Sequence, residues 1–151
     1  MIVSLYQPDI PQNTGSLIRL CACMGIALHI IEPCGFIFDD KKMRRAMMDY
    51  YDLASVTRHQ SWEKFLDYCQ TRGRLILLTT KAEDNYTEFT FRPDDILLLG
   101  SESKGAPQTV HDKADARIKI PLHAEARSLN IAQAASMILG EALRQTNQFP
   151  A

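Results

Sequence analysis

Four short runs of almost uninterrupted apolar residues constrain the fold more than any other feature of this sequence. They are separated by amphipathic stretches and span residues 2–6, 27–31, 75–78 and 96–99. A strand that is buried on one face alternates apolar and polar residues, whereas a strand buried on both faces is apolar throughout. Strands that alternate with helical segments favour an α/β domain with a mostly parallel sheet flanked by helices.

The stretches between these runs carry helix signals. The last helix is the clearest, because its apolar residues recur at helical spacing: Ile131, Ala134, Ala135, Ile138, Leu139 and Ala142. Asn13 is predicted to cap a helix over residues 14–24 that stops at Gly25. Asp40 is predicted to cap a helix that runs through Tyr50. We also expect helices at 61–71 and 107–113, short strands at 54–57 and 117–121, and an irregular strand near Phe89 and Phe91.

Length and composition fit one soluble domain over residues 1–151. Domains commonly run to about 100–200 residues. The chain is 46% hydrophobic and 23% charged, which excludes a disordered tail and a disulfide-stapled miniprotein. No apolar run approaches the roughly 18 residues that span a membrane, and the first twelve residues lack a signal-peptide pattern. We therefore expect a cytoplasmic protein without membrane contact.

The cysteines and histidines do not form a metal-binding pattern. Cys21, Cys23, Cys34 and Cys69 lack zinc-site spacing. Cys21 and Cys23 would lie about 200° apart around a helix and could not hold one metal ion together. The four histidines have no spacing such as H-x-x-x-H. The sequence predicts buried free thiols and no metal.

The charge balance allows only local contacts with nucleic acid. Seventeen Lys and Arg against 18 Asp and Glu give a net charge of −1, so there is no bulk basic field. One dense basic run contains Lys41, Lys42, Arg44 and Arg45. Such a run forms either a solvated helix face or a patch that binds phosphates, and its composition alone is compatible with both.

Three polar, turn-rich segments follow predicted strands, which is where ligands bind in open α/β sheets. They cover residues 8–15 with Arg19 beyond them, residues 100–105, and residues 118–122 with 127–130. Each segment is also compatible with an ordinary turn or helix start. Ser128 and Asn130, for example, are both good helix N-caps.

The second segment, Gly-Ser-Glu-Ser-Lys-Gly at 100–105, matches none of the common glycine-rich motifs. It lacks the Gly-Lys-Ser/Thr ending of a P-loop and the G-x-G-x-x-G pattern of dinucleotide-binding proteins. Ser101 stands where a nucleophile elbow around Ser103 needs a glycine. The two glycines permit tight turns and a close approach of the backbone to a ligand.

Taken together, the three segments resemble the three motifs of the SPOUT superfamily of knotted RNA methyltransferases. Asn-Thr-Gly at 13–15 with Arg19 is similar to the first motif, residues 98–105 to the second, and residues 120–134 to the third. The order matches, and the likeness covers nearly the whole chain. Within the superfamily the chain most resembles the small, single-domain tRNA (cytidine(34)-2'-O)-methyltransferases, which share features such as Leu-His-Ile-Ile-Glu-Pro at 28–33.

The resemblance implies a deep trefoil knot at the carboxyl end and a homodimer with each site near the subunit boundary. It implies methylation of the ribose 2'-oxygen of the wobble nucleotide in tRNA, cytidine or modified uridine. S-adenosylmethionine would be the cofactor and S-adenosylhomocysteine the product. The residues that would bind the cofactor are Leu78, Gly100, Ile120 and Ser128.

The resemblance also assigns roles outside the cofactor pocket. Arg19 would contact the 2'-oxygen and the adjacent phosphate, while Glu102 and Asn130 would order the site. The basic run, Lys41, Lys42, Arg44 and Arg45, would bind phosphates of the anticodon stem-loop. Two residues depart from the family pattern: Lys104 replaces a common Arg, and Gly140 stands where relatives tend to have a bulky residue.

Two other functions compete with methyl transfer. The first is a nucleotide-binding or RNA-binding protein of the same fold without transferase activity. The second is an unrelated α/β hydrolase that uses Ser103 as its nucleophile. Binding of S-adenosylmethionine separates the methyltransferase from the hydrolase, and methyl transfer to tRNA separates it from the binding protein.

Overall fold

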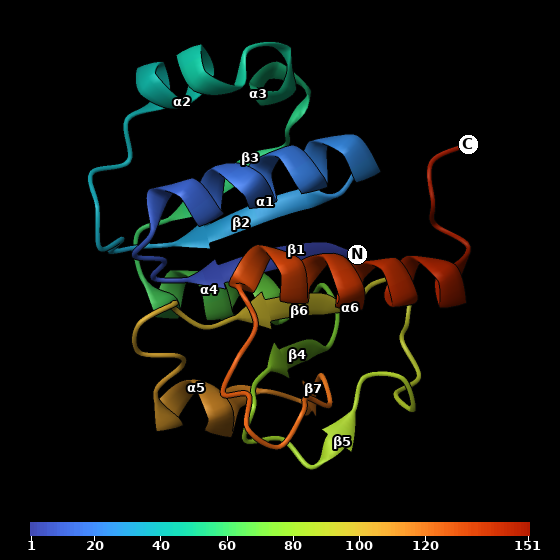
Figure 1. Ribbon diagram of the computed structural model, residues 1–151. Coiled ribbons are helices and arrows are strands. Elements are labelled where there is room, and N and C mark those ends of the chain that lie inside the picture. The colour runs from blue at the N-terminus through green and yellow to red at the C-terminus, as the bar shows by residue number, and fades with distance from the viewer.

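A seven-stranded sheet runs through the centre of the protein, as seen in a computed structural model that describes all 151 residues (Figure 1). The strand order is β3-β2-β1-β6-β4-β7-β5, and every pairing is parallel. The strands are β1 (Ile2–Tyr6), β2 (Ala27–Ile31), β3 (Val56–His59), β4 (Leu75–Leu78), β5 (Asp84–Asn85), β6 (Ile96–Leu99) and β7 (Ala116–Lys119). The predicted parallel α/β architecture is confirmed.

Helices cover both faces of the sheet (Figure 1). They are α1 (Pro11–Met24), α2 (Asp40–Met47), α3 (Asp49–Leu53), α4 (Trp62–Cys69), α5 (Gln108–Lys113) and α6 (Ile131–Thr146). Helices α1 and α6 lie side by side on one face, and α2 and α3 stack on α1. Helices α4 and α5 pack against the other face.

Two hydrophobic cores explain why the strands are apolar throughout. Leu97 and Leu99 of β6 join the core under α1 and α6, whereas Ile96 and Leu98 join the core under α4 and α5. All four side chains are at most 3% exposed. Successive residues of a strand point to opposite faces, so both positions must be apolar. Burial of one such side chain stabilises the fold by about 1.5–3 kcal/mol.

The first helix begins earlier than predicted. Helix α1 starts at Pro11, and its N-cap Ile10 makes no side-chain capping bond. Proline suits the first position of a helix because its φ is already helical and its missing N–H would be unpaired there. Asn13 therefore lies inside the first turn and is not the cap. The end of the helix is as predicted, since Gly25 adopts the left-handed conformation with φ 65°.

The predicted helix from Asp40 to Tyr50 is two helices. Asp39, not Asp40, caps α2, because its carboxylate accepts from the N–H groups of the next helical turn. Met48 then takes φ 52°, which breaks the helix before α3. A positive φ is uncommon in a residue other than glycine. The residue type of Met48 therefore did not predict the helix break.

Two strand positions also differ from the prediction. The third strand lies at Val56–His59, where it pairs with β2, and not at 54–57. The short strand between β4 and β6 is Asp84–Asn85. Phe89 and Phe91 lie outside any strand and contact each other edge to face, and Phe91 is buried in the core.

The cysteines are free, and three of the four are at least partly buried. Burial raises the pKa of Cys21 and Cys69 to about 12 and that of Cys34 to about 11. Cys23 contradicts the prediction of buried thiols, because it is exposed on α1. The structure has no group of three residues that could hold a metal ion. No helix has both the length and the apolar character needed to cross a membrane.

Candidate functional site

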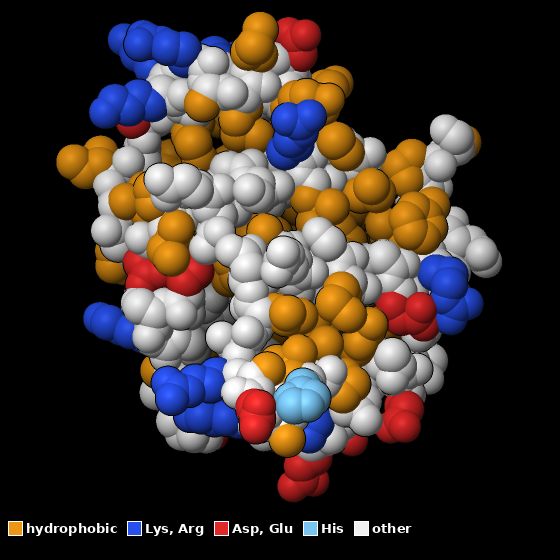
Figure 2. All heavy atoms as spheres, viewed as in Figure 1, with side chains coloured by type: hydrophobic (Ala, Val, Ile, Leu, Met, Phe, Trp, Pro, Cys, Tyr) orange, Lys and Arg blue, Asp and Glu red, His pale blue; other side chains and the backbone are white.

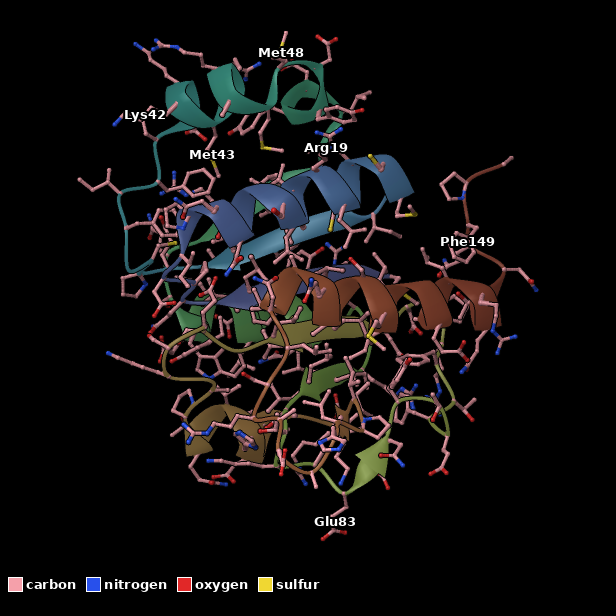
Figure 3. All side chains as sticks on the ribbon, in the orientation of Figure 1. Arg19, Lys42, Met43, Met48, Glu83 and Phe149 are labelled. Atoms are coloured by element: carbon pink, nitrogen blue, oxygen red, sulfur yellow. The ribbon has the colours of Figure 1, made fainter.

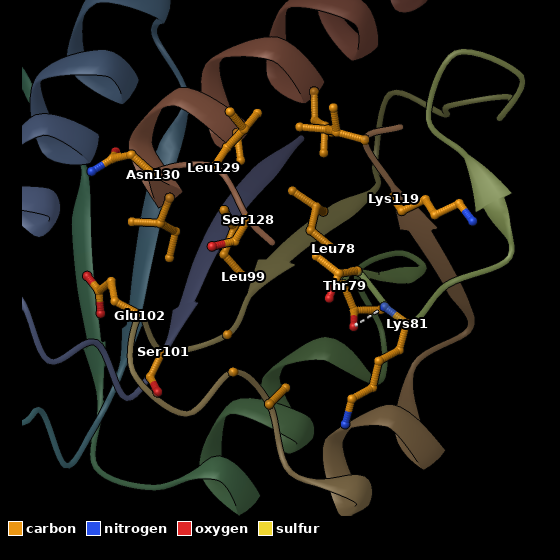
Figure 4. A pocket seen from close by; sticks show the side chains of 18 of the residues that line it. Leu78, Thr79, Lys81, Leu99, Ser101, Glu102, Lys119, Ser128, Leu129 and Asn130 are labelled. Atoms are coloured by element: carbon orange, nitrogen blue, oxygen red, sulfur yellow. Dashed lines mark hydrogen bonds between the residues drawn. The ribbon is translucent and has the colours of Figure 1, made fainter. Parts of the chain in front are cut away.

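A cavity of about 540 Å³ opens where β6, β4 and β7 end, at the carboxyl edge of the sheet (Figure 4). Loops after these strands and the first turn of α6 form its walls. Leu78, Gly100, Ile120 and Ser128 all line it. The fold therefore brings together the four residues, far apart in sequence, that the resemblance assigns to the cofactor.

Glycine is required at the turn that forms one wall. A Cβ on Gly100 would lie 2.6 Å from the carbonyl carbon of Gly105 and 2.7 Å from the nitrogen of Ala106. The turn closes through two backbone hydrogen bonds between Ser101 and Gly105, at 3.0 and 2.8 Å. Gly105 itself has φ 66°. Any side chain at Gly100 would clash with the backbone of Gly105 and Ala106. Only glycine therefore fits at this turn, and its lack of a side chain leaves the backbone accessible from the cavity.

Asn13 joins the three polar segments at the mouth of the cavity. Its Nδ2 donates to Glu102 Oε1 at 3.4 Å, and its Oδ1 accepts from Asn130 Nδ2 at 2.9 Å. Asn130 also caps α6, since its Oδ1 accepts from the N–H of Ala132 at 2.9 Å. Glu102 and Asn130 are thus connected through Asn13. Asn13 belongs to the first candidate segment, but the only individual role predicted for it was that of a helix cap.

Asp9 and Glu102 place two carboxyl groups side by side. The Asp9 N–H donates to Glu102 Oε2 at 2.9 Å, and the Ser103 hydroxyl donates to Asp9 Oδ2. Burial, followed by the neighbouring Asp9 carboxyl, raises the pKa of Glu102. Hydrogen bonds with Glu102 and Ser103 lower the pKa of Asp9. Ser103 donates to the Asp9 carboxylate and forms no hydrogen bond with a histidine, so the Ser-His arrangement of a serine hydrolase is not formed around it.

Arg19 does not line the main cavity. It is exposed on α1, and its guanidinium carbon lies 4.3 Å from the centre of the Tyr50 ring. It borders a second, smaller hollow between α1 and the α2–α3 segment, with Gly15, Met48 and Tyr50 among its neighbours. Figure 3 shows Arg19 between α1 and α3, at a distance from the strand ends. Within a single chain, Arg19 therefore lies apart from the residues predicted to bind the cofactor.

The basic run lies on α2 at the surface. Figure 2 shows Lys and Arg side chains at the end of the molecule where Figure 1 places α2. Lys41, Lys42, Arg44 and Arg45 are all exposed. Arg44 is paired with Asp52, whereas the other three form no ion pair within the chain. Three of the four cations of the patch are thus unpaired within the chain.

Further cavity residues gave no signal in the sequence. Thr79 and Lys81 follow β4 directly, and His111 reaches the cavity from α5. Burial is the main cause that lowers the pKa of His111, and the nearby Lys81 and Arg117 act in the same direction. Which strand ends and helices meet at the cavity is visible only once the strand order is known.

Comparison with known proteins identifies the family. The SpoU rRNA Methylase family matches residues 1–140. The chain belongs to this family. The resemblance to SPOUT methyltransferases seen in the sequence is thereby confirmed.

Several curated relatives of this SpoU-family chain carry the name tRNA (cytidine(34)-2'-O)-methyltransferase. The protein of that name from Beijerinckia indica subsp. indica is 57% identical over 145 residues, covering 95% of this chain and 91% of its own. The protein from Escherichia coli strain K12 is 43% identical, with 95% and 92% covered. Wobble 2'-O-methylation, the function predicted from the sequence, is therefore the one named for these relatives.

Solved SpoU-family structures agree with the fold. A structure described as giving insights into the 2-OH methylation of C/U34 on tRNA has a TM-score of 0.87 and 38% identity, covering 95% of this chain and 88% of that one. The SpoU methyltransferase AviRb from Streptomyces viridochromogenes, in complex with the cofactor AdoMet, has a TM-score of 0.83 and 27% identity. That match covers 96% of this chain and 60% of AviRb.

Proposed function

We propose that this protein transfers a methyl group from S-adenosylmethionine to the ribose 2'-oxygen of the wobble nucleotide, cytidine or modified uridine, in tRNA. The observation that carries the proposal is the cavity at the carboxyl ends of β6, β4 and β7, lined by Leu78, Gly100, Ile120 and Ser128. Relatives with 38–57% identity carry the name of this activity.

The cavity suits the methyl donor chemically. Leu78 and Ile120 offer an apolar wall for a purine ring together with backbone donors and acceptors. Gly100 leaves its backbone open to close approach, and Ser128 precedes the N-terminus of α6. S-adenosylmethionine is consumed in each turnover, so it acts as a co-substrate, and its sulfonium supplies an electrophilic methyl group. No metal ion is part of the proposal.

The protein must then align the 2'-hydroxyl and stabilise charge on its oxygen. We assign this charge stabilisation to Arg19, whose planar fork can contact the oxygen and the adjacent phosphate. Glu102 and Asn130, joined through Asn13, hold the loops around the donor. The α2 patch, Lys41, Lys42, Arg44 and Arg45, binds phosphates of the anticodon stem-loop, which positions the RNA.

The active form in this proposal is a homodimer. Arg19 and the cavity are separate within one chain, yet α1 and α6, which carry them, lie side by side on one face. Leu129, Met137 and Phe149, on or next to α6, are 37%, 43% and 51% exposed. A second copy seated on this face would cover these apolar side chains and bring its Arg19 to the cavity of the first. The single domain over 1–151, the trefoil knot and a cytoplasmic location belong to the same proposal.

The test is transfer of a radiolabelled methyl group from S-adenosylmethionine to bulk tRNA, followed by mapping of the modified nucleotide. The expected product is a 2'-O-methylated nucleotide 34. Binding of the donor without any methyl transfer would instead favour an RNA-binding or nucleotide-binding protein of the same fold.

A further inference from the structure

The Asp9–Glu102 pair contains an acceptor that lacks a donor. Asp9 Oδ2 accepts from the Ser103 hydroxyl, but Asp9 Oδ1 is buried without a hydrogen-bond partner. Both oxygens of Glu102 are occupied, by the N–H of Asp9 and by the amide of Asn13. A buried acceptor without a donor destabilises the folded state, because its hydrogen bonds to water are lost and not replaced. A proton on Glu102 would provide the missing donor.

The surroundings hold the pair in place. A Cβ on Gly35 would lie 2.5 Å from Asp9 Cβ, so the loop before α2 packs directly on Asp9. The N–H of Gly35 donates to the carbonyl of Pro8 at 2.9 Å, which fixes the backbone beside it. Asp9 therefore cannot swing away from Glu102 without moving this loop.

No cation neutralises the two carboxyl groups. Neither Asp9 nor Glu102 forms an ion pair, and Lys104 on the same turn is exposed. The other titratable group beside Glu102 is the Cys34 thiol, whose pKa burial raises to about 11, so it is neutral at pH 7. Glu102 consequently binds a proton more readily than an exposed glutamate does.

We propose that Glu102 accepts the proton of the ribose 2'-hydroxyl during methyl transfer, and that Asp9 is the positioning residue that receives the hydrogen bond of protonated Glu102. This inference rests on the proposed function. The 2'-oxygen forms a bond to the methyl carbon while the bond from that carbon to sulfur breaks, leaving a neutral thioether. The O–H bond of the ribose breaks and its proton passes to the Glu102 carboxylate, from which water later removes it.

The position of Glu102 fits this role. It lines the cavity together with the predicted donor-binding residues, and Figure 4 shows its carboxyl group at the cavity wall near Ser101. Arg19 cannot accept the proton, because a guanidinium stays protonated at any working pH. A carboxylate with a raised pKa is a better base than an ordinary one.

The experiment is single-turnover methylation of tRNA between pH 5 and 9, at saturating tRNA and S-adenosylmethionine. The wild-type rate should rise with pH along an acid limb and then level off. Glu102→Gln should lose at least about 10²-fold in rate and lose the acid limb. Glu102→Asp should keep a limb at a reduced rate. Asp9→Asn removes a negative neighbour, so the midpoint of its limb should move to lower pH.

Glu83→Gln is the matched control, because Glu83 is exposed, does not line the cavity and projects outward at the edge of the molecule in Figure 3. It should keep both rate and midpoint. Calorimetry with S-adenosylmethionine and circular dichroism at each pH establish that every variant is folded and binds the donor.

Three results would overturn the inference: a wild-type rate without an acid limb, a Glu102→Gln rate within about threefold of wild type, or an unchanged midpoint in Asp9→Asn. In each case wild-type methylation of nucleotide 34 would leave the proposed function standing. A wild-type protein that methylates no tRNA would overturn the proposed function itself.

Discussion

At the scale of single residues, Asn13 shows why an amide is needed between Glu102 and Asn130. It donates to a carboxylate, Glu102, and accepts from a second amide, Asn130. Aspartate has the same shape but no donor, and it would face Glu102 with a like charge. The three polar segments are therefore linked by a group that can both give and receive a hydrogen bond.

Replacing Arg19 should separate the binding of S-adenosylmethionine from the methyl-transfer step. Arg19→Ala should keep the affinity for S-adenosylmethionine within a few-fold, because Arg19 does not line the cavity. Methyl transfer should fall by about 10²-fold or more, since loss of one preorganised charge-stabilising donor costs about 2.7–4 kcal/mol. Arg19→Lys should restore little, because an ammonium cannot reproduce the fork. The measurement is the single-turnover methylation rate at saturating tRNA. A near wild-type rate in Arg19→Ala would show that Arg19 has no part in methyl transfer.

At the scale of elements, α2 should contribute affinity without contributing chemistry. Lys42→Ala should weaken tRNA binding and make its dependence on salt shallower by about one counterion, because one phosphate contact is lost. The single-turnover rate at saturating tRNA should stay near wild type. Lys113→Ala, on the exposed end of α5, is the matched control. An unchanged salt slope in Lys42→Ala would show that α2 is a solvated face.

Strands β2 and β3 carry a buried histidine pair that should make stability depend on pH. His29 Nδ1 and His59 Nε2 lie 2.8 Å apart beside Phe65 and Tyr68. Burial, then His59 and Arg72, lowers the pKa of His29 to about 4, and burial lowers the pKa of His59. Unfolded histidines bind protons near pH 6.5, so the stabilisation is complete above that pH and is lost as the pH falls toward 4.

Urea unfolding at pH 7 and pH 4.5 measures this loss, which we expect to be about 1–3 kcal/mol. A double variant, His29→Leu with His59→Leu, should lose much less over the same interval. His123→Gln should behave like wild type, because His123 is exposed. Equal losses in the double variant and wild type would contradict a role for the pair.

The sequence predicted the buried elements better than the connections between them. The strands β1, β2, β4 and β6 lie at the expected residues because burial on both faces leaves an unbroken apolar run. The start of α1 was wrong because Ile10 and Pro11 carry no side-chain capping signal. The break at Met48 was missed because a positive φ is uncommon for a residue other than glycine, so the residue type did not indicate the break.

The candidate site was predictable only in part, for a related reason. Turn residues and the family resemblance identified Gly100, Glu102 and Asn130 as candidate site residues. The hydrogen bonds of Asn13 and the pairing of Asp9 with Glu102 join residues about 90 or more positions apart. No local pattern encodes such contacts, because they depend on strand order.

At the scale of the whole molecule, a dimeric site allows two defective subunits to complement each other. Ser128→Phe should obstruct the cavity at the start of α6 and weaken donor binding by calorimetry. Arg19→Ala should leave the cavity intact. When the two variants are co-expressed with different tags and the mixed dimer is purified, one site would combine an intact cavity with the partner's intact Arg19. The mixed dimer should then recover up to half of the wild-type rate.

The pure Arg19→Ala and Ser128→Phe dimers, which should both stay nearly inactive, are the controls. No recovery in the mixed dimer would mean that each site takes Arg19 from its own chain. A protein that is monomeric by light scattering yet fully active would remove the dimer from the mechanism.

The single exposed thiol, Cys23, makes the protein easy to label at one place. Maleimides react with thiolates, and the other three cysteines are shielded by burial and by raised pKa values. Cys23 is four residues after Arg19 on α1, which puts both on the same side of the helix. A fluorophore attached there would sit one helical turn from the residue assigned to the reacting oxygen. The natural sequence thus provides an optical reporter of RNA arrival without any prior removal of cysteines.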